Sequence, residues 1–183
     1  MTRQEAFALL KERVSNGNLV KHSLATEAIM GVLAAHFGED EEIWRLAGLL
    51  HDIDYDATRD DPARHSREGS QFLAELRLDP RIVQAVLTHN DYHGVPRESK
   101  LDRALHAVDP LTGLITAAAL IRKEKSLSAV TPQFVLGRFG EKGFARGASR
   151  PQIGSCTELG LTLEEFVTLG IAAMQEISQE LGL

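Results

Sequence analysis

Apolar residues recur along almost the whole chain at the i, i+3, i+4 and i+7 spacing of an amphipathic helix. No stretch shows the sustained alternation of a half-buried strand. This spacing constrains the fold strongly, because each such helix must bury its apolar stripe against neighbours. The pattern predicts an all-α protein. With 183 residues, 43% of them hydrophobic, we expect one domain over residues 1–183.

Turn and cap residues divide this pattern into segments. The long expected helices run approximately from Thr2 to Val14, Leu19 to Phe37, Glu39 to Asp52, Pro62 to Leu76, Pro80 to His89 and Leu101 to Lys125. Shorter helices are expected to begin at Pro132, at Pro151 and after the capping box Thr162–Glu165, the last reaching about Leu181. Asp54–Asp61 and Asn90–Pro96 are expected loops, and Pro110 is expected to kink or end its helix.

Charge, hydropathy and cysteine content limit the binding partners and the cellular compartment that we expect. The net charge of -6, from 26 acidic and 20 basic residues, argues against a nucleic-acid polymer but is compatible with a small phosphorylated ligand. No apolar run reaches the roughly 20 residues of a membrane span, so no membrane partner is expected. The single Cys156 excludes an internal disulfide, and Thr2–Lys11 is unlike a signal peptide. These features predict a cytoplasmic protein.

One helix end carries an imidazole and a carboxylate side by side. The apolar run Trp44–Leu50 leads directly into His51 and Asp52, and then into an acidic stretch. Taken alone, such a pair is an ordinary helix C-terminus, where a histidine favours the dipole. His22 and Asp109, however, also fall near a predicted helix end or break. Neutral imidazole with carboxylate oxygen is a donor set that divalent ions prefer, so these residues predict a metal site.

The same residues carry a family resemblance, through Lys21-His-Ser23, Leu50-His-Asp-Ile53 and Ala107-Val-Asp-Pro110. The chain resembles the HD superfamily of all-helical metal-dependent phosphohydrolases over about its first 120 residues. The resemblance implies that His22, His51, Asp52 and Asp109 bind metal. It also implies an HD-type helical bundle with a metal-site core at about residues 19–125 and extra C-terminal helices at about 126–183.

Two further histidines, His65 and His89, look like the additional ligands of the two-metal HD subgroup. That subgroup includes HD-GYP cyclic-dinucleotide phosphodiesterases and bacterial diadenosine-tetraphosphate hydrolases. In the two-metal subgroup, one carboxylate bridges two ions that activate the attacking water. Asp52 occupies the matching position, so the resemblance implies that Asp52 is catalytic. The resemblance implies that the chain binds one or two divalent ions, which could be Mn, Fe, Mg, Ni or Zn. The chain lacks the Gly-Tyr-Pro element, which argues against a cyclic dinucleotide substrate.

Substrate contacts are expected from two loops. Glu141–Arg150 is glycine-rich and basic, so Lys142, Arg146 and Arg150 are candidate phosphate contacts. An ordinary solvated basic loop is the alternative. His93 lies in the loop after His89, where it is expected to orient a phosphate or a leaving group unless it is a plain loop residue. This C-terminal region resembles that of uncharacterised prokaryotic HD hydrolases.

The expected activity is a metal-dependent phosphohydrolase that cleaves a small, nucleotide-like phosphate ester or anhydride by attack of metal-bound water. Two alternatives stay open. Some HD proteins with the same ligand set hold two irons and activate dioxygen, and others with eroded motifs serve as ligand-sensing modules. Metal identity separates the first alternative from a hydrolase, and the presence of the core ligands argues against the second. A homo-oligomer also stays open.

Overall fold

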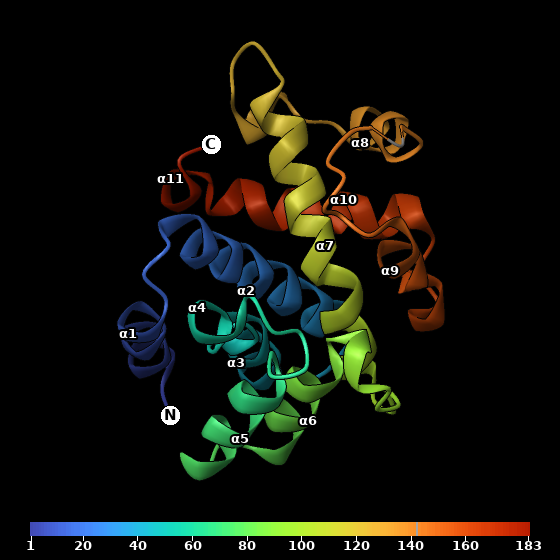
Figure 1. The fold of residues 1–183 in the computed structure, drawn as a ribbon. Helices are drawn as coiled ribbons and strands as arrows, with labels where there is room; N and C mark the ends of the chain where they lie inside the picture. Colours follow the sequence, from blue (N-terminus) through green and yellow to red (C-terminus); the bar gives the residue numbers. More distant parts are fainter. Residues whose placement is uncertain (142) are drawn as a thin grey trace.

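The computed structural model describes residues 1–141 and 143–183, and the described residues form helices and turns without a β-strand. This confirms the all-α prediction. The longest helices, α2 (Gly17–Phe37) and α7 (Lys100–Leu120), pack against each other at the centre (Figure 1). Around them lie α1 (Arg3–Arg13), α3 (Glu41–Leu50), α4 (Tyr55–Thr58), α5 (Arg67–Glu75), α6 (Pro80–Thr88), α8 (Pro132–Phe139), α9 (Arg150–Gly154), α10 (Leu163–Glu176) and α11 (Ser178–Leu181). Short 3-10 turns lie at Asp91–His93, Leu127–Ala129 and Ser155–Leu159.

Residues 23–31 of helix α2 are buried on every face. The helix packs against α3, α7 and α10. The contact with α3 is especially close, because a Cβ at Gly48 would lie 3.0 Å from the backbone of Glu27. A glycine at position 48 therefore permits the backbone approach that brings the end of α3 beside the first turns of α2.

The segment between α3 and α5 differs from the prediction. The expected loop Asp54–Asp61 contains the short helix α4, and the helix expected from Pro62 begins only at Arg67. The late start has a local cause, since Ser66 has a positive φ of 63° and cannot belong to a right-handed helix. His65 consequently lies in a turn and not on a helix.

Of the two expected effects of Pro110, a kink or an end of the helix, the second is wrong, because Pro110 lies inside α7, which continues to Leu120. A proline inside a helix removes one backbone hydrogen bond and costs roughly 3 kcal/mol. Fully buried leucines on both sides of it, including Leu105 and Leu111, pack into the core and offset that penalty. Asp109 therefore projects from a continuous helix, without the expected break in front of the proline.

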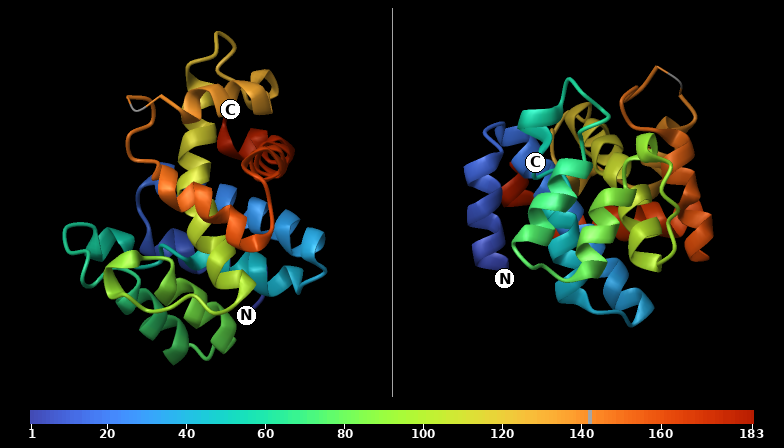
Figure 2. Two further views of the ribbon diagram at one scale, coloured as in Figure 1. Left: turned by 90° about the vertical axis from the view of Figure 1, so that its right-hand side faces the viewer. Right: turned by 60° about the horizontal axis from the view of Figure 1, so that its bottom comes forward.

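The C-terminal elements follow the predicted signals closely. Proline lies at the start of α8 and α9, and the capping box between Thr162 and Glu165 opens α10. The expected single helix to Leu181 is divided, because α10 ends at Glu176 and α11 follows. Figure 2 shows α7 running between α8 at one end and α5 and α6 at the other. Within the described residues, none of the helices has the length and hydropathy needed to cross a bilayer.

Candidate metal centre

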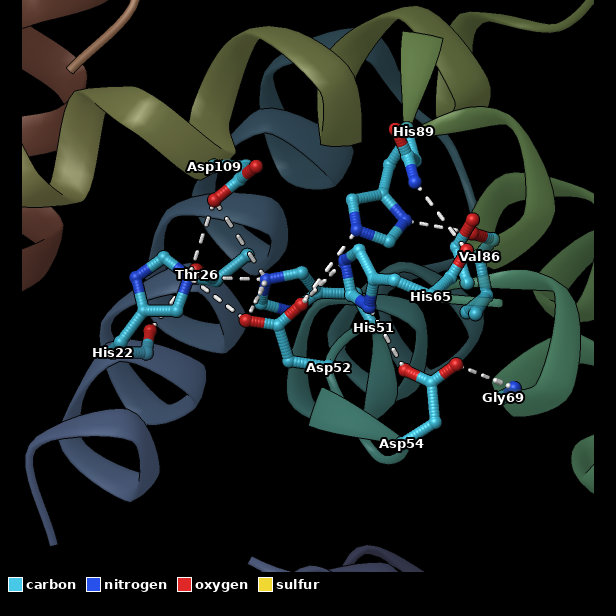
Figure 3. Close-up of polar contacts among 12 residues, drawn as sticks. His22, Thr26, His51, Asp52, Asp54, His65, Gly69, Val86, His89 and Asp109 are labelled. Carbon is cyan, nitrogen blue, oxygen red and sulfur yellow. Dashed lines mark hydrogen bonds and ion pairs between the residues drawn. The ribbon is translucent and has the colours of Figure 1, made fainter. Parts of the chain in front are cut away.

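Side chains from five parts of the chain point toward one another in Figure 3. They come from α2, the end of α3, the turn before α5, the end of α6, and α7. The set is His22, His51, Asp52, His65, His89 and Asp109. The fold therefore collects every residue predicted to bind metal into one cluster.

Two of these histidines occupy equivalent positions at helix ends. His51 is the C-cap of α3 and His89 is the C-cap of α6. In each, Nδ1 donates to the carbonyl three residues earlier, at 2.8 Å to Gly48 and at 2.6 Å to Val86. Carbonyls in the last turn of a helix otherwise have no partner within it. This hydrogen bond satisfies the helix end and directs Nε2 into the cluster.

The first half-site comprises His22, His51, Asp109 and the Oδ2 atom of Asp52. The Nε2 atoms of His22 and His51 lie 3.0 Å apart. Asp109 Oδ1 lies 3.2 Å from Nε2 of His22 and 3.9 Å from Nε2 of His51. Asp52 Oδ2 lies 3.6 Å and 3.5 Å from the same two nitrogens. Two nitrogens and two carboxylate oxygens thus surround one point.

The second half-site comprises His65, His89 and the other oxygen of Asp52. Asp52 Oδ1 lies 3.4 Å from Nε2 of His65 and 3.6 Å from Nε2 of His89. Asp52 is buried, so its carboxylate is fixed between the two groups of histidines. One carboxylate therefore offers one oxygen to each half-site.

A hydroxyl determines which nitrogen of His22 is free. The Oγ1 of Thr112 donates its hydrogen to the carbonyl of Asp109 at 2.8 Å. The same oxygen lies 2.8 Å from Nδ1 of His22, and having already donated its hydrogen it can only accept. Nδ1 must therefore carry a hydrogen, which leaves the lone pair of the neutral ring on Nε2, facing the cluster.

A carboxylate does the same for His65. Asp54 Oδ1 lies 3.0 Å from Nδ1 of His65, while Oδ2 accepts the backbone N–H of Gly69 at 2.8 Å. A Cβ at Gly69 would lie 3.1 Å from the carboxyl carbon of Asp54, so only glycine allows this approach without a shift. A carboxylate behind a metal-binding imidazole fixes its tautomer and raises its basicity as a ligand.

Burial and the carboxylates have opposite effects on the charge of the cluster. Burial lowers the pKa of His51 to about 4, so that ring is neutral at pH 7. For His22 and His89 burial also opposes the charged form, but Asp109 and Asp52 hold the pKa of these rings above its ordinary value. For Asp52 burial favours the neutral acid, yet the surrounding histidines hold its pKa far below the usual range. The centre therefore needs positive charge, from protons or from a cation.

The donor set fits divalent ions. Two groups have ligand atoms close enough to hold an ion, namely His22 with His51 and Asp52, and Asp52 with His65 and His89. The facing Nε2 lone pairs of His22 and His51, 3.0 Å apart, repel unless a proton or a metal lies between them. Imidazole and carboxylate without thiolate suit Mn, Fe, Ni or Zn, with Mg the least suited because it prefers oxygen.

The predicted substrate contacts lie outside the cluster. His93 is half-buried, and its Nε2 donates to the carbonyl of His65 at 2.7 Å. Arg146 is exposed on the loop after α8, whereas Lys142 lies outside the described residues. Arg150 does not present a free guanidinium, because it donates to the carbonyls of Arg138, Phe139, Phe144, Ala145 and Ala148. It holds the loop together, and the predicted phosphate contact from Arg150 is not supported.

Two residues that orient the ligands were absent from the sequence prediction. Asp54 belonged to a stretch expected to be a solvated loop, and Thr112 resembled any other polar residue of an apolar helix. Spacing offers a signal for Thr112, since it lies three residues after Asp109 and shares its helix face. Asp54, two residues after Asp52, has no comparable signal, because its burial depends on α5.

Comparisons with known proteins agree with this geometry. The family model described as HD domain matches residues 19–119. Ribonuclease Y 2 of Pediococcus pentosaceus is 35% identical over 103 residues, which are 55% of this chain and 19% of that protein. Ribonuclease Y of Bacillus thuringiensis is 30% identical over 149 residues, or 77% of this chain and 28% of that protein. No solved structure gives a significant match.

The chain thus spans less than a third of the length of these curated relatives. The family match covers over half of the 183 residues of this chain and contains all six clustered residues. The chain belongs to the HD domain family.

Proposed function

We propose that this protein is a metal-dependent phosphohydrolase that cleaves a small phosphate ester or anhydride. One observation carries the proposal: the Nε2 atoms of four histidines face the two oxygens of a single buried carboxylate, Asp52. When bound there, divalent ions would polarise phosphoryl oxygens and lower the pKa of a bound water toward 7. Membership of the HD family supports a metal-using hydrolase.

The chain's own residues divide this task. Asp52 would hold both ions and fix their positions relative to each other, while His65 and His89 would complete the second half-site. His22 and Asp109 form the open side, because their side chains are 21% and 31% exposed while that of His51 is fully buried. A phosphoryl group would therefore reach the centre past His22 and Asp109. Buried His51 keeps water from the opposite side.

Arg146 and His93 are proposed substrate contacts. Arg146 is an exposed guanidinium on a loop whose neighbours Ala145, Gly147 and Ala148 line a hollow beside Asp109. Guanidinium forks match phosphoryl oxygens, so this position suits a phosphate that reaches the centre. His93 is bound to the carbonyl of His65, which places it beside the second half-site. Lys142 is proposed from the sequence alone.

A second candidate is cleavage of short RNA. The names of the relatives favour it, since those proteins are ribonucleases that share the matched region. The net charge of -6 argues against a sequence-independent grip on a long polymer by this chain. Small substrates therefore remain the first proposal, and RNA fragments of a few nucleotides are the second.

A substrate screen across metals tests the proposal. The protein is freed of metal, loaded in turn with Mn, Fe, Mg, Ni or Zn, and assayed with phosphomonoesters, phosphodiesters, phosphoanhydrides and short RNA. We expect turnover that requires metal, is lost in Asp52→Asn and is kept in Asp60→Asn, a matched change at an almost fully exposed carboxylate. Oxygen consumption by an iron-loaded protein without phosphate release would instead identify an oxygenase. Equal turnover in both variants would place the chemistry elsewhere.

A further inference from the structure

Two hollows open beside the first half-site, and both are lined in part by His22 and Gly113. The larger, of about 430 Å³, lies between the first turns of α2, the second half of α7 and the segment after α10; we call it the α2–α7 hollow. The smaller, of about 310 Å³, lies between α7 and the loop containing Ala145 and Gly147. A substrate that approaches past His22 and Asp109 meets both.

The two hollows differ in charge. Apart from the ligands His22 and Asp109, the smaller one is lined by proline, glycine and alanine. The α2–α7 hollow carries polar groups from Asn18 and Thr116, apolar surface from Leu120 and Leu181, and one charged side chain, that of Lys21. Groups of this kind can hold the rest of a substrate whose phosphate lies at the metal centre.

Lys21 lies where it can act on such a substrate. It directly precedes His22 on α2 and is exposed, and it forms no ion pair with any described residue. A Cβ on Gly182 would lie 3.0 Å from Nζ of Lys21, so the ammonium group rests against the wall of the hollow. The chain as a whole carries a net charge of -6 and therefore repels anions. The ammonium group of Lys21 makes the α2–α7 hollow a local exception, where an anionic group of a ligand is favoured.

On the basis of the proposed phosphohydrolase function, we propose that the α2–α7 hollow binds the non-reacting part of the substrate and that Lys21 contacts a second phosphate there. The substrate class is then a molecule with two phosphate groups, such as a nucleoside bisphosphate or a very short oligonucleotide. The reacting phosphoryl group occupies the cluster and the second phosphate lies beyond His22.

Matched ligands with one or two phosphates test this assignment. Adenosine 3′,5′-bisphosphate is compared with adenosine 5′-phosphate and adenosine 3′-phosphate, so that the bisphosphate carries an extra anion whichever group reacts. Dissociation constants are measured by calorimetry on metal-loaded protein, and phosphate release is measured separately. The variants are Lys21→Gln, Lys21→Arg and Lys123→Gln, the last at an exposed lysine outside this hollow.

We expect the wild type to bind the bisphosphate about tenfold more tightly than the better monophosphate, as one charge-assisted hydrogen bond gives. Lys21→Gln should reduce that preference to within about twofold, while Lys21→Arg and Lys123→Gln retain it. No preference in the wild type, or an unchanged preference in Lys21→Gln, would overturn the assignment. A Lys21-dependent preference without phosphate release under any metal would keep the anion contact and reject the proposed hydrolysis.

Discussion

The two half-sites share Asp52 but hold their histidines differently. In the first, Nδ1 of His22 is held by the neutral hydroxyl of Thr112, and the ligand side chains reach 31% exposure at Asp109. In the second, Nδ1 of His65 is held by the buried carboxylate of Asp54, and the ligand side chains of His65 and His89 are 16% and 2% exposed. A charged partner strengthens a ligand, and exposure admits a substrate. If each half-site holds an ion, the second half-site would hold its ion more firmly and the ion of the first half-site would meet the substrate.

The substitution with the largest expected effect removes the carboxylate of Asp52, which the two half-sites share. Asp52→Asn replaces the shared carboxylate with a neutral amide, so both half-sites should lose metal affinity and turnover should fall by at least about 1000-fold. Helical circular dichroism should be unchanged, because the core around Leu46, Leu49 and Leu114 does not depend on this carboxylate. The melting temperature should fall modestly without metal, because the ion pairs of Asp52 with the histidines are lost, and further in the presence of metal, through the loss of mass-action stabilisation. A variant that unfolds without metal would show a structural role instead.

A matched pair of changes separates the half-sites. Asp54→Asn should weaken one of the two ions by about 10- to 100-fold, and Thr112→Val, which removes a hydroxyl with little change in shape, should weaken the other. Calorimetric titration of metal-free protein reads the two affinities separately. If both variants weaken the same ion, the division into half-sites is wrong.

Protons should leave the centre when metal binds. Asp109 and Asp52 hold the pKa of His22 and of His89 above its ordinary value, so protons compete with an ion at these two rings. Metal affinity should therefore rise as pH increases through the raised pKa, by up to about tenfold per pH unit for each proton released. His51, whose pKa is lowered to about 4, contributes no proton at pH 7. Titrations in two buffers of different ionisation enthalpy count the protons, and a count of zero contradicts this electrostatic description.

The substitution with the smallest expected effect changes a residue outside both half-sites, Arg146. Arg146→Ala should raise KM about two- to fivefold without changing metal content, since an exposed charged contact contributes little. Arg59→Ala, at another exposed arginine, serves as the control and should leave KM unchanged. Equal KM values in the two variants would remove Arg146 from the substrate site.

The fold was largely predictable because its signals are local. Helical spacing, the cap Asp79 before Pro80, and the capping box at Thr162 each act within a few residues. The errors arise where distant packing decides the local structure. Ser66 takes a positive φ within a folded turn, and Pro110 stays helical because α7 is buried on both sides of it.

The residues of the site also divide into those that the sequence predicts and those that only the folded structure identifies. The pair His51 and Asp52 is visible in sequence because an apolar helix ends there. The supporting groups are not visible, since Asp54 becomes a buried partner of His65 only after α5 supplies Gly69. Lys21 gains its setting from residues 181–183, far along the chain. Sequence thus indicates the donors, and the fold supplies what orients them.

The count of metal ions per chain tests the central claim most directly. Native mass spectrometry of protein loaded with one metal at saturation measures that count in the wild type, His65→Ala and Asp52→Asn. If one carboxylate serves two half-sites, the wild type holds two ions, His65→Ala holds one, and Asp52→Asn holds none at the concentration that saturates the wild type. A wild type with a single ion, or an Asp52→Asn variant that still holds two, would contradict the account.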